Sequence, residues 1–187
     1  LVGWTGQNLS LANSMIYSYT MTKDKNDLSM GLNTFETWAN HGRLENGLIR
    51  CLFDYVLGDE DEGKEVQDAC NLSEAALNFF EAWDILKGYN IEKPKYKDIA
   101  LGICNFVIKN QSSDGSFGKS WTNNGEIADP NGTIGCYLVA PLVKAYEITG
   151  DKKYLEAAKR GYDFYISSFL RDGYTSAAAL DTYCIDK

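Results

Sequence analysis

The sequence predicts an all-α fold made of tandem antiparallel helical hairpins, and three observations support this prediction. A segment that begins Tyr19-Thr-Met-Thr-Lys-Asp24 recurs as Tyr146-Glu-Ile-Thr-Gly-Asp151, and apolar residues follow both copies in the same register. Apolar residues also recur at helical spacing through most of the chain. Finally, long polar loops fall at only one kind of junction between the expected helices. An internal repeat of this kind indicates stacked hairpins.

Six helices are expected from the spacing of apolar residues and from local start and stop signals. They span about residues 8–21, 25–39, 72–86, 93–109, 133–148 and 152–169. Pro94 suits the first turn of the fourth helix, where a missing N–H costs little. Gly150 followed by Asp151 is typical of a helix end followed by an N-cap. Pro141 falls inside the fifth expected helix, and we expect it to kink that helix or remove a hydrogen bond there.

The lengths of the connections indicate which end of the hairpins carries function. The third and fifth expected helices are apolar around most of their circumference, which is typical of inner helices. Connections from inner to outer helices are short, whereas connections 41–71, 111–132 and 171–186 are long. All long loops therefore emerge at one end, around the N-termini of the inner helices. Loops held by a rigid scaffold commonly carry binding and catalytic residues.

Composition limits the classes of function. The 187 residues carry a net charge of −8, which argues against nucleic acid or an anionic membrane as partner. No apolar run approaches the ~18 residues of a transmembrane helix. We treat 1–187 as a single domain. Because the sequence begins without Met and stops inside a repeat, we expect it to be a fragment of a larger structure, and its compartment is not predicted.

The chemistry available to the chain is equally limited. His41 is the only histidine, so a histidine-based triad or a His-rich metal site is not expected. The five cysteines are scattered and lack metal-ligand spacing, and free thiols are the simplest interpretation. We predict neither a metal nor a cofactor. Any catalysis must use carboxylates, Tyr, Lys or Arg.

Carboxylates and aromatic rings gather in the long loops and just before the expected inner helices. The catalytic candidates are Asp181, Asp68 and Asp186, and the substrate-binding candidates are Trp4, Gln7, His41, Arg43, Asp114, Trp121 and Tyr183. Paired carboxylates that flank a bond are the usual equipment for glycoside hydrolysis, and flat rings suit the apolar faces of sugars. Structural interpretations stand beside these. Asp68 and Asp186 are equally suited to cap helices, and Asp114-Gly115 to form a turn.

The alternating hairpins, the Tyr-x-x-Thr-Gly-Asp-x-x-Tyr-Leu-x-x-Ala segment at 146–158 and the aspartates before inner helices resemble the (α/α) toroids of carbohydrate-active enzymes. Segment 67–72 is similar to the inner-helix start of unsaturated glucuronyl and rhamnogalacturonyl hydrolases. The resemblance implies part of an (α/α)6-type toroid, with three hairpins and the start of a fourth. It also implies an active cleft at the inner-helix N-termini and an oligosaccharide substrate.

The leading hypothesis is therefore a glycoside hydrolase-like protein that acts on an oligosaccharide through carboxylate acid/base chemistry. The alternative is a noncatalytic helical-repeat module that binds glycan or peptide, since tandem hairpins commonly serve that role. A third expectation concerns the flanks of an open toroid. Its first and last hairpins would expose apolar edges, which predicts self-association.

Overall fold

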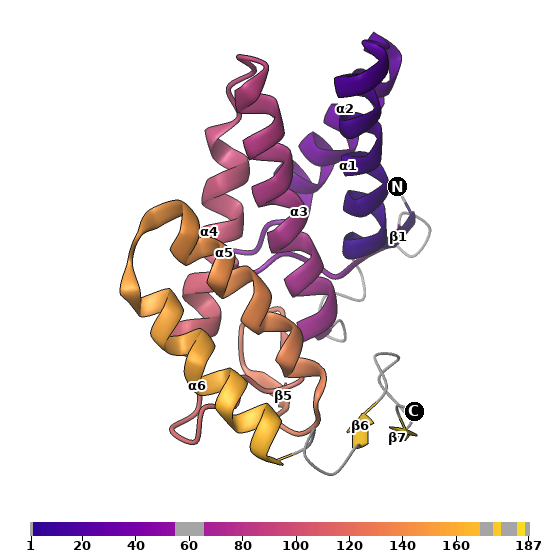
Figure 1. Cartoon of the computed structure of the whole chain (residues 1–187). Coiled ribbons are helices and arrows are strands. Elements are labelled where there is room, and N and C mark those ends of the chain that lie inside the picture. The colour runs from indigo at the N-terminus through magenta and orange to yellow at the C-terminus, as the bar shows by residue number, and fades with distance from the viewer. Residues whose placement is uncertain (1, 55–65, 169–173, 177–182, 186–187) are drawn as a thin grey trace.

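The computed structural model describes residues 2–54, 66–168, 174–176 and 183–185. Within them the chain forms six α-helices in three antiparallel pairs (Figure 1). The helices are α1 (Thr5–Thr22), α2 (Lys25–His41), α3 (Ala69–Gly88), α4 (Pro94–Lys109), α5 (Val139–Thr149) and α6 (Lys152–Ser168), and a 3-10 helix η2 (Ile134–Leu138) leads into α5. The prediction of an all-α fold built from tandem hairpins is confirmed.

The sequence repeat corresponds to a repeated turn. At the end of α1 the backbone of Lys23 adopts a left-handed conformation and its N–H donates to the Tyr19 carbonyl at 2.9 Å. At the end of α5 the same conformation occurs at Gly150, whose N–H donates to the Tyr146 carbonyl at 2.7 Å. Both bonds satisfy carbonyls that a helix end leaves unpaired.

The next helix of each pair also begins in the same way. Asp24 caps α2 by accepting a hydrogen bond from the backbone N–H of Asn26 at 2.8 Å. Asp151 accepts the equivalent bond from the N–H of Lys153 at 3.0 Å, just before α6. Each carboxylate satisfies a donor that the first turn of a helix cannot pair internally. The two hairpins therefore share one turn design, as the repeat predicts.

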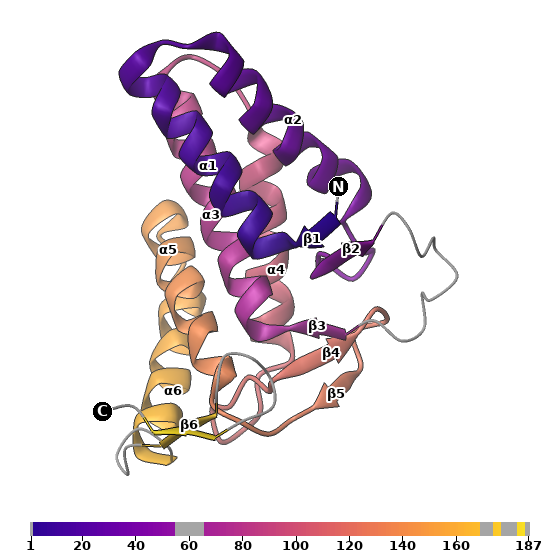
Figure 2. The same ribbon diagram turned by 90° about the vertical axis from the view of Figure 1, so that its right-hand side faces the viewer.

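The helices form an inner and an outer layer. Helix α3 packs against α1 on one side, against η2 and α5 on the other, and against its own partner α4. Helices α2, α4 and α6 cover α1, α3 and α5 from outside (Figures 1 and 2). This packing agrees with the expectation that the third and fifth helices, α3 and α5, are inner helices. Helix α1 is an inner helix as well.

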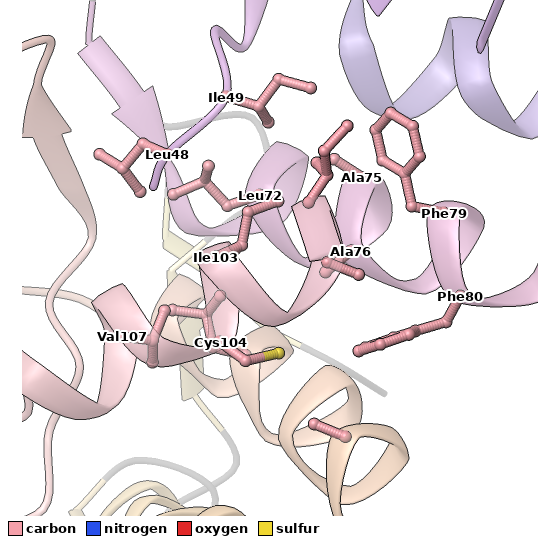
Figure 3. Close-up of a cluster of buried hydrophobic side chains, with 14 of the residues drawn as sticks. Leu48, Ile49, Leu72, Ala75, Ala76, Phe79, Phe80, Ile103, Cys104 and Val107 are labelled. Carbon is pink, nitrogen blue, oxygen red and sulfur yellow. The ribbon is translucent and has the colours of Figure 1, made fainter. Parts of the chain in front are cut away.

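The core lies between the two layers. Leu72 and Ala76 of α3 face Ile103 and Val107 of α4, and Leu48 covers one end of this contact (Figure 3). A second part of the core is aromatic. The rings of Phe35, Phe79 and Tyr96 join α2, α3 and α4, with centroids 5.2 to 5.5 Å apart. Edge-to-face and offset pairs of this kind add to the stabilisation from apolar burial.

Short strands lie before α1 and in the long connections, toward one end of the helices (Figure 2). Strand β1 (Val2–Trp4) pairs with β2 (Leu52–Asp54), and β6 (Tyr174–Ser176) pairs with β7 (Tyr183–Ile185). Strands β3 (Val66–Asp68), β4 (Ser120–Thr122) and β5 (Ile127–Asp129) form a three-stranded antiparallel sheet. Each of these strands has only three residues, which is too short for a period-two pattern to stand out in the sequence.

The predicted kink at Pro141 is wrong. Helix α5 begins at Val139, so Pro141 lies in its first turn, where the N–H would have no partner within the helix. The preceding residues form the tighter η2 instead of extending α5. Pro141 is buried, and its carbonyl accepts a hydrogen bond from the Cys104 thiol at 3.5 Å, which ties α5 to α4.

Candidate functional site

The candidate site lies where α1 and α3 begin, at the end of the molecule that carries the long connections. Asp68, the last residue of β3, caps α3 through a hydrogen bond from the Asn71 backbone N–H to its Oδ1, at 2.9 Å. The Asn71 side chain donates a second bond to Oδ2 at 2.8 Å. Both oxygens are thus held, and Asp68 is only 3% exposed. The capping interpretation of Asp68 is correct, and the cap fixes a carboxylate at this place.

Asn71 also connects the two inner helices. Its Oδ1 accepts a hydrogen bond from the Gly6 backbone N–H at 3.2 Å. Gly6 lies in the first turn of α1, whose N–H groups have no partner within the helix. One side chain therefore satisfies an unpaired donor of α1 while it orients the Asp68 carboxylate on α3.

Glu74 lies in the second turn of α3, beside Gly6 and on the same face as Cys70. Burial raises the pKa of the Glu74 carboxyl above its ordinary value, and the negative charge of Asp68 raises it further. The Cys70 thiol donates to Glu74 Oε1 at 4.0 Å. Sequence reasoning missed Glu74 because a glutamate within a helix resembles an ordinary surface residue. The arrangement supplies a carboxyl that holds its proton more strongly than usual.

A polar seam continues from this site along the contact between α1 and α3. The Asn13 side chain donates to Asn78 Oδ1 at 3.1 Å and to Glu81 Oε2 at 2.8 Å. Asn78 in turn donates to Ser10 Oγ at 3.0 Å. Asn13 and Asn78 are buried, so these bonds offset the cost of removing their amides from water. The seam fixes α1 against α3 and thereby the geometry at their N-terminal ends.

Two exposed aromatic residues lie at the starts of the inner helices on either side of α3. Trp4 occupies the N-cap position of α1 and is 38% exposed. Tyr137 of η2 is also exposed, and its backbone carbonyl accepts a hydrogen bond from Ser73 of α3 at 2.7 Å. Gln7, predicted to bind substrate, is exposed in the first turn of α1. Sequence reasoning placed Trp4 and Gln7 here but missed Tyr137.

Trp121 lies in the core rather than on a surface. It belongs to β4, pairs with Gln67 of β3 and is 1% exposed. Its ring meets the Phe106 ring edge to face, with centroids 5.7 Å apart. No face of the indole is open to a sugar, so the structure does not support the prediction that Trp121 lines a subsite.

Asp114 forms a turn, as the structural interpretation of Asp114-Gly115 expected. Its Oδ1 accepts hydrogen bonds from the Ser116 backbone N–H at 2.9 Å and from the Ser116 hydroxyl at 2.8 Å. These bonds lower the pKa of the Asp114 carboxyl. Gly115 approaches the backbone carbonyl of Arg160 on α6 so closely that a Cβ would lie 2.5 Å from it. The turn therefore packs on an outer helix.

The remaining candidates fall in two groups. His41 ends α2 and is exposed, and Arg43 follows in the loop that leads to β2, where it lines a cavity with Arg50 and Asn123. Asp181 and Asp186 lie outside the described residues. Tyr183 begins β7, pairs with Ser176 and is described only through its backbone.

Neither a metal centre nor a membrane span is found in the part of the chain that the structure describes. Among those residues, no three His, Cys, Asp or Glu side chains are grouped so that they could hold a metal ion. The same residues include no helix long and apolar enough to cross a membrane. Cys51, Cys70, Cys104 and Cys136 are free thiols, and burial raises the pKa of Cys70 to about 11.

Several solved structures with this arrangement of helices are enzymes that act on sugars. A cellobiose 2-epimerase from Bacillus thermoamylovorans is 19% identical and superposes with a TM-score of 0.70 over 87% of this chain and 41% of its own. A family 76 α-mannanase from Bacteroides thetaiotaomicron is 16% identical, with a TM-score of 0.67 over 94% and 48% of the two chains. An unsaturated glucuronyl hydrolase from a Bacillus species is 16% identical, with a TM-score of 0.65 over 91% and 47%.

These likenesses concern the fold, since the identities are low. No protein-family profile matches the sequence, and no curated protein sequence matches it. The chain spans less than half the length of the epimerase, the mannanase and the glucuronyl hydrolase. Its three hairpins thus have the architecture of part of an (α/α) toroid, the fold of these carbohydrate-active enzymes.

Proposed function

We propose that this chain is carbohydrate-active and acts on an oligosaccharide by carboxylate acid/base chemistry at the N-terminal ends of its inner helices. One observation carries the proposal. Two carboxyl groups, Asp68 and Glu74, lie together at the start of α3, and the pKa of Glu74 is raised by burial and by the charge of Asp68. A raised carboxyl pKa suits the general acid of a glycoside hydrolase, because that group must hold a proton before it delivers it.

The two carboxyl groups have different environments and hence different proposed roles. Glu74 is half-buried, so a bound substrate can reach its carboxyl, and it donates its proton to the oxygen of the departing sugar. Asp68 is almost fully buried and both its oxygens are engaged by Asn71. We therefore assign Asp68 as a positioning residue whose negative charge raises the pKa of Glu74. The catalytic role predicted for Asp68 passes to Glu74.

Hydrolysis also needs a second carboxylate, which either activates water or attacks the sugar carbon. Asp181 and Asp186 remain the candidates for that role. They belong to the connection that follows α6 in the sequence. Trp4 and Tyr137, exposed on either side of α3, supply flat rings for the apolar faces of sugar units.

The fold comparison supports the same class of substrate. The similar enzymes are named for action on cellobiose, mannan and glycosaminoglycan. Their fold is shared by an epimerase and by hydrolases, so the fold favours sugar chemistry without choosing between these reactions. The raised pKa of Glu74 favours hydrolysis, in which a carboxylic acid protonates a leaving oxygen.

The test combines thermal shift with product analysis. The purified chain is heated with a panel of neutral and uronic-acid oligosaccharides, because a ligand that binds only the folded state raises the melting temperature. Products are then measured for each oligosaccharide that binds. Glu74→Gln is expected to lower turnover by about 10²- to 10⁴-fold, the usual contribution of a general acid, with little change in binding. Glu156→Gln, on the exposed face of α6, is the matched control.

The outcomes distinguish the two hypotheses that the sequence suggests, a glycoside hydrolase-like enzyme and a noncatalytic binding module. Turnover that survives Glu74→Gln would overturn the assignment of Glu74. Binding of an oligosaccharide with no product from any member of the panel would favour the noncatalytic helical-repeat module.

The carboxyl ¹³C resonance of Glu74 gives a direct check on the role of Asp68. Asp68→Asn removes a negative charge, so the pKa of Glu74 should fall.

A further inference from the structure

A cavity of about 610 Å³ lies apart from the Glu74 site, between the loop that joins α2 to β2 and the turn that joins β4 to β5. Its volume lies within the range of about 300–1,000 Å³ that is typical of ligand pockets. Its walls are mostly polar and include Arg43, Leu44, Glu45, Asn46, Arg50, Asn123 and Asn124.

The walls of this cavity are fixed by hydrogen bonds between segments that are far apart in the sequence. Asn46 donates to the backbone carbonyl of Asn123 at 3.0 Å, which holds the loop against the turn. The Asn123 side-chain oxygen accepts a bond from Gln67 Nε2 at 2.6 Å. Gln67 is fully buried, and its Oε1 accepts a hydrogen bond from the Cys51 N–H. A site held in this way is preorganised, which lowers the cost of ordering it on binding.

The backbone of the loop is fixed as well. Arg43 forms an isolated antiparallel bridge with Ile49, and the Leu44 N–H donates to the Leu48 carbonyl at 2.9 Å. The Arg50 N–H donates to the Gly42 carbonyl at 2.7 Å. Both arginines are therefore anchored at their backbones on opposite sides of one tight loop.

The charge of the cavity differs from that of the whole chain. The protein carries a net charge of −8 and contains four arginines, and two of them line this one cavity. Among the lining residues that the structure describes, Glu45 is the only acidic one. Guanidinium groups form paired, charge-assisted hydrogen bonds with the oxygens of carboxylates and sulfates. The neighbouring asparagine amides suit hydroxyl groups, since each both donates and accepts.

The cavity and the Glu74 site lie on opposite faces of β3. Side chains of successive residues in a strand point to opposite sides. Gln67 points toward Asn123 and the cavity, whereas Asp68 points toward Asn71 at the start of α3. A ligand in the cavity is therefore separated from the carboxyl pair by the strand itself. Occupancy of one site does not require occupancy of the other.

We propose that this cavity is a second binding site, which takes a sugar unit that bears a carboxylate or a sulfate group. Arg43 binds the anionic oxygens, Arg50 contributes positive charge to the same wall of the cavity, and the side chains of Asn46 and Asn124 contact the ring hydroxyls. The inference stands on the cavity and its arginines and does not depend on Glu74 as general acid.

The test is an NMR titration of the purified chain with D-glucuronate, with glucose 6-sulfate and with glucose. We expect the side-chain amide resonances of Asn46 and Asn124 to shift with at least one of the two acidic sugars and not with glucose. The sugar that causes the shift identifies the anionic group. Arg43→Gln should weaken this binding about tenfold or more, because it removes a charge-assisted pair of hydrogen bonds. Arg160→Gln makes the same change on α6, outside the cavity, and should leave the binding unchanged.

Further variants distinguish this proposal from the first. Arg43→Lys keeps the charge but loses the forked geometry, so it should weaken binding nearly as much as Arg43→Gln. Glu74→Gln should leave the titration unchanged even if it abolishes turnover. The proposal is overturned if glucose shifts the same resonances as strongly as the acidic sugars, or if none of the three does. It is also overturned if the acidic sugars shift Asn71 at the Glu74 site and leave Asn46 and Asn124 unaffected.

Discussion

Glu74 of α3 occupies the space beside Gly6 of α1 where any other residue would place its Cβ. A Cβ added to Gly6 would lie 1.8 Å from Glu74 Oε2 and 2.9 Å from Glu74 Cβ. The first turn of α1 can approach α3 only because position 6 has no side chain. The same approach allows the Gly6 N–H to reach Asn71 and places backbone over the Glu74 carboxyl, which contributes to its burial.

Gly6→Ala is therefore expected to destabilise the protein and displace Glu74. Overpacking of this kind costs about 1–3 kcal/mol because the two helices must separate. The change is measured by urea denaturation and by the carboxyl resonance of Glu74. Gly88→Ala is the matched control, since a Cβ at Gly88 meets nothing within 4 Å. Equal stability of the two variants would show that α1 does not press on Glu74.

Asn71 should be as important to the site as the carboxylate that it holds. Asn71→Ala removes both side-chain contacts, to Asp68 and to the Gly6 N–H. We expect a loss of about 1–2 kcal/mol, because a donor of α1 is left unpaired. Combining this change with Asp68→Ala should cost less than the sum of the single changes, since the two residues share bonds. Strict additivity in urea denaturation would contradict the network, and Asn33→Ala on the exposed side of α2 is the control.

The hairpin architecture was predictable because it depends on local signals. The turn that ends in Asp24 and the turn that ends in Asp151 each need a left-handed residue followed by a carboxylate cap, and both leave a readable pattern. The N-cap role of Asp68 was predictable for the same reason. At most of the helix ends, the observed boundary differs from the predicted one by only a few residues.

The composition of the candidate site was harder to predict because it depends on contacts between distant segments. Glu74 is distinguished by Gly6 and Asp68, which no local pattern connects to it. Trp121 lies in a Gly/Asn-rich connection that resembles an exposed loop, yet pairing of β4 with β3 turns its ring onto Phe106. The cavity at Arg43 likewise needs Asn123, which lies in the β4–β5 turn.

Glu36 should give the protein a pH-dependent part of its stability. Its Oε1 accepts hydrogen bonds from Lys93 Nζ at 2.6 Å and from the Tyr96 hydroxyl at 3.0 Å, which joins α2 to α4. Burial acts to raise the pKa of Glu36, but these two bonds outweigh it and lower the pKa below its ordinary value of 4.5. A lowered carboxyl pKa stabilises the folded state above the unfolded-state pKa. That stabilisation is lost as pH falls through the folded-state value.

Glu36→Gln is therefore expected to lower stability near neutral pH by about 1 kcal/mol or less, since the pair is partly exposed to solvent. The difference from the unmodified protein should disappear once the pH is well below 4.5, where Glu36 is protonated in both states. Urea denaturation at several pH values measures this. Glu92→Gln, an exposed change just before α4, is the control. A difference that persists unchanged at acid pH would mean that packing, not charge, links α2 to α4.

Trp4 and Trp121, the two tryptophans that the sequence suggests for substrate binding, should differ in how substitution affects stability and sugar binding. Trp121→Ala removes a fully buried ring and is expected to cost about 3–5 kcal/mol of stability, the usual range for a large aromatic residue in a core. Trp4→Ala removes a ring that is 38% exposed at the start of α1, so its effect on stability should be smaller. If Trp4 stacks on a sugar, its loss should weaken oligosaccharide binding by about 0.5–1.5 kcal/mol, and Trp4→Phe should restore part of it. Melting temperature and ligand titration on the same two variants decide the matter. Unchanged binding by Trp4→Ala would remove Trp4 from the site and leave Tyr137, exposed on the other side of α3, as the ring to test next.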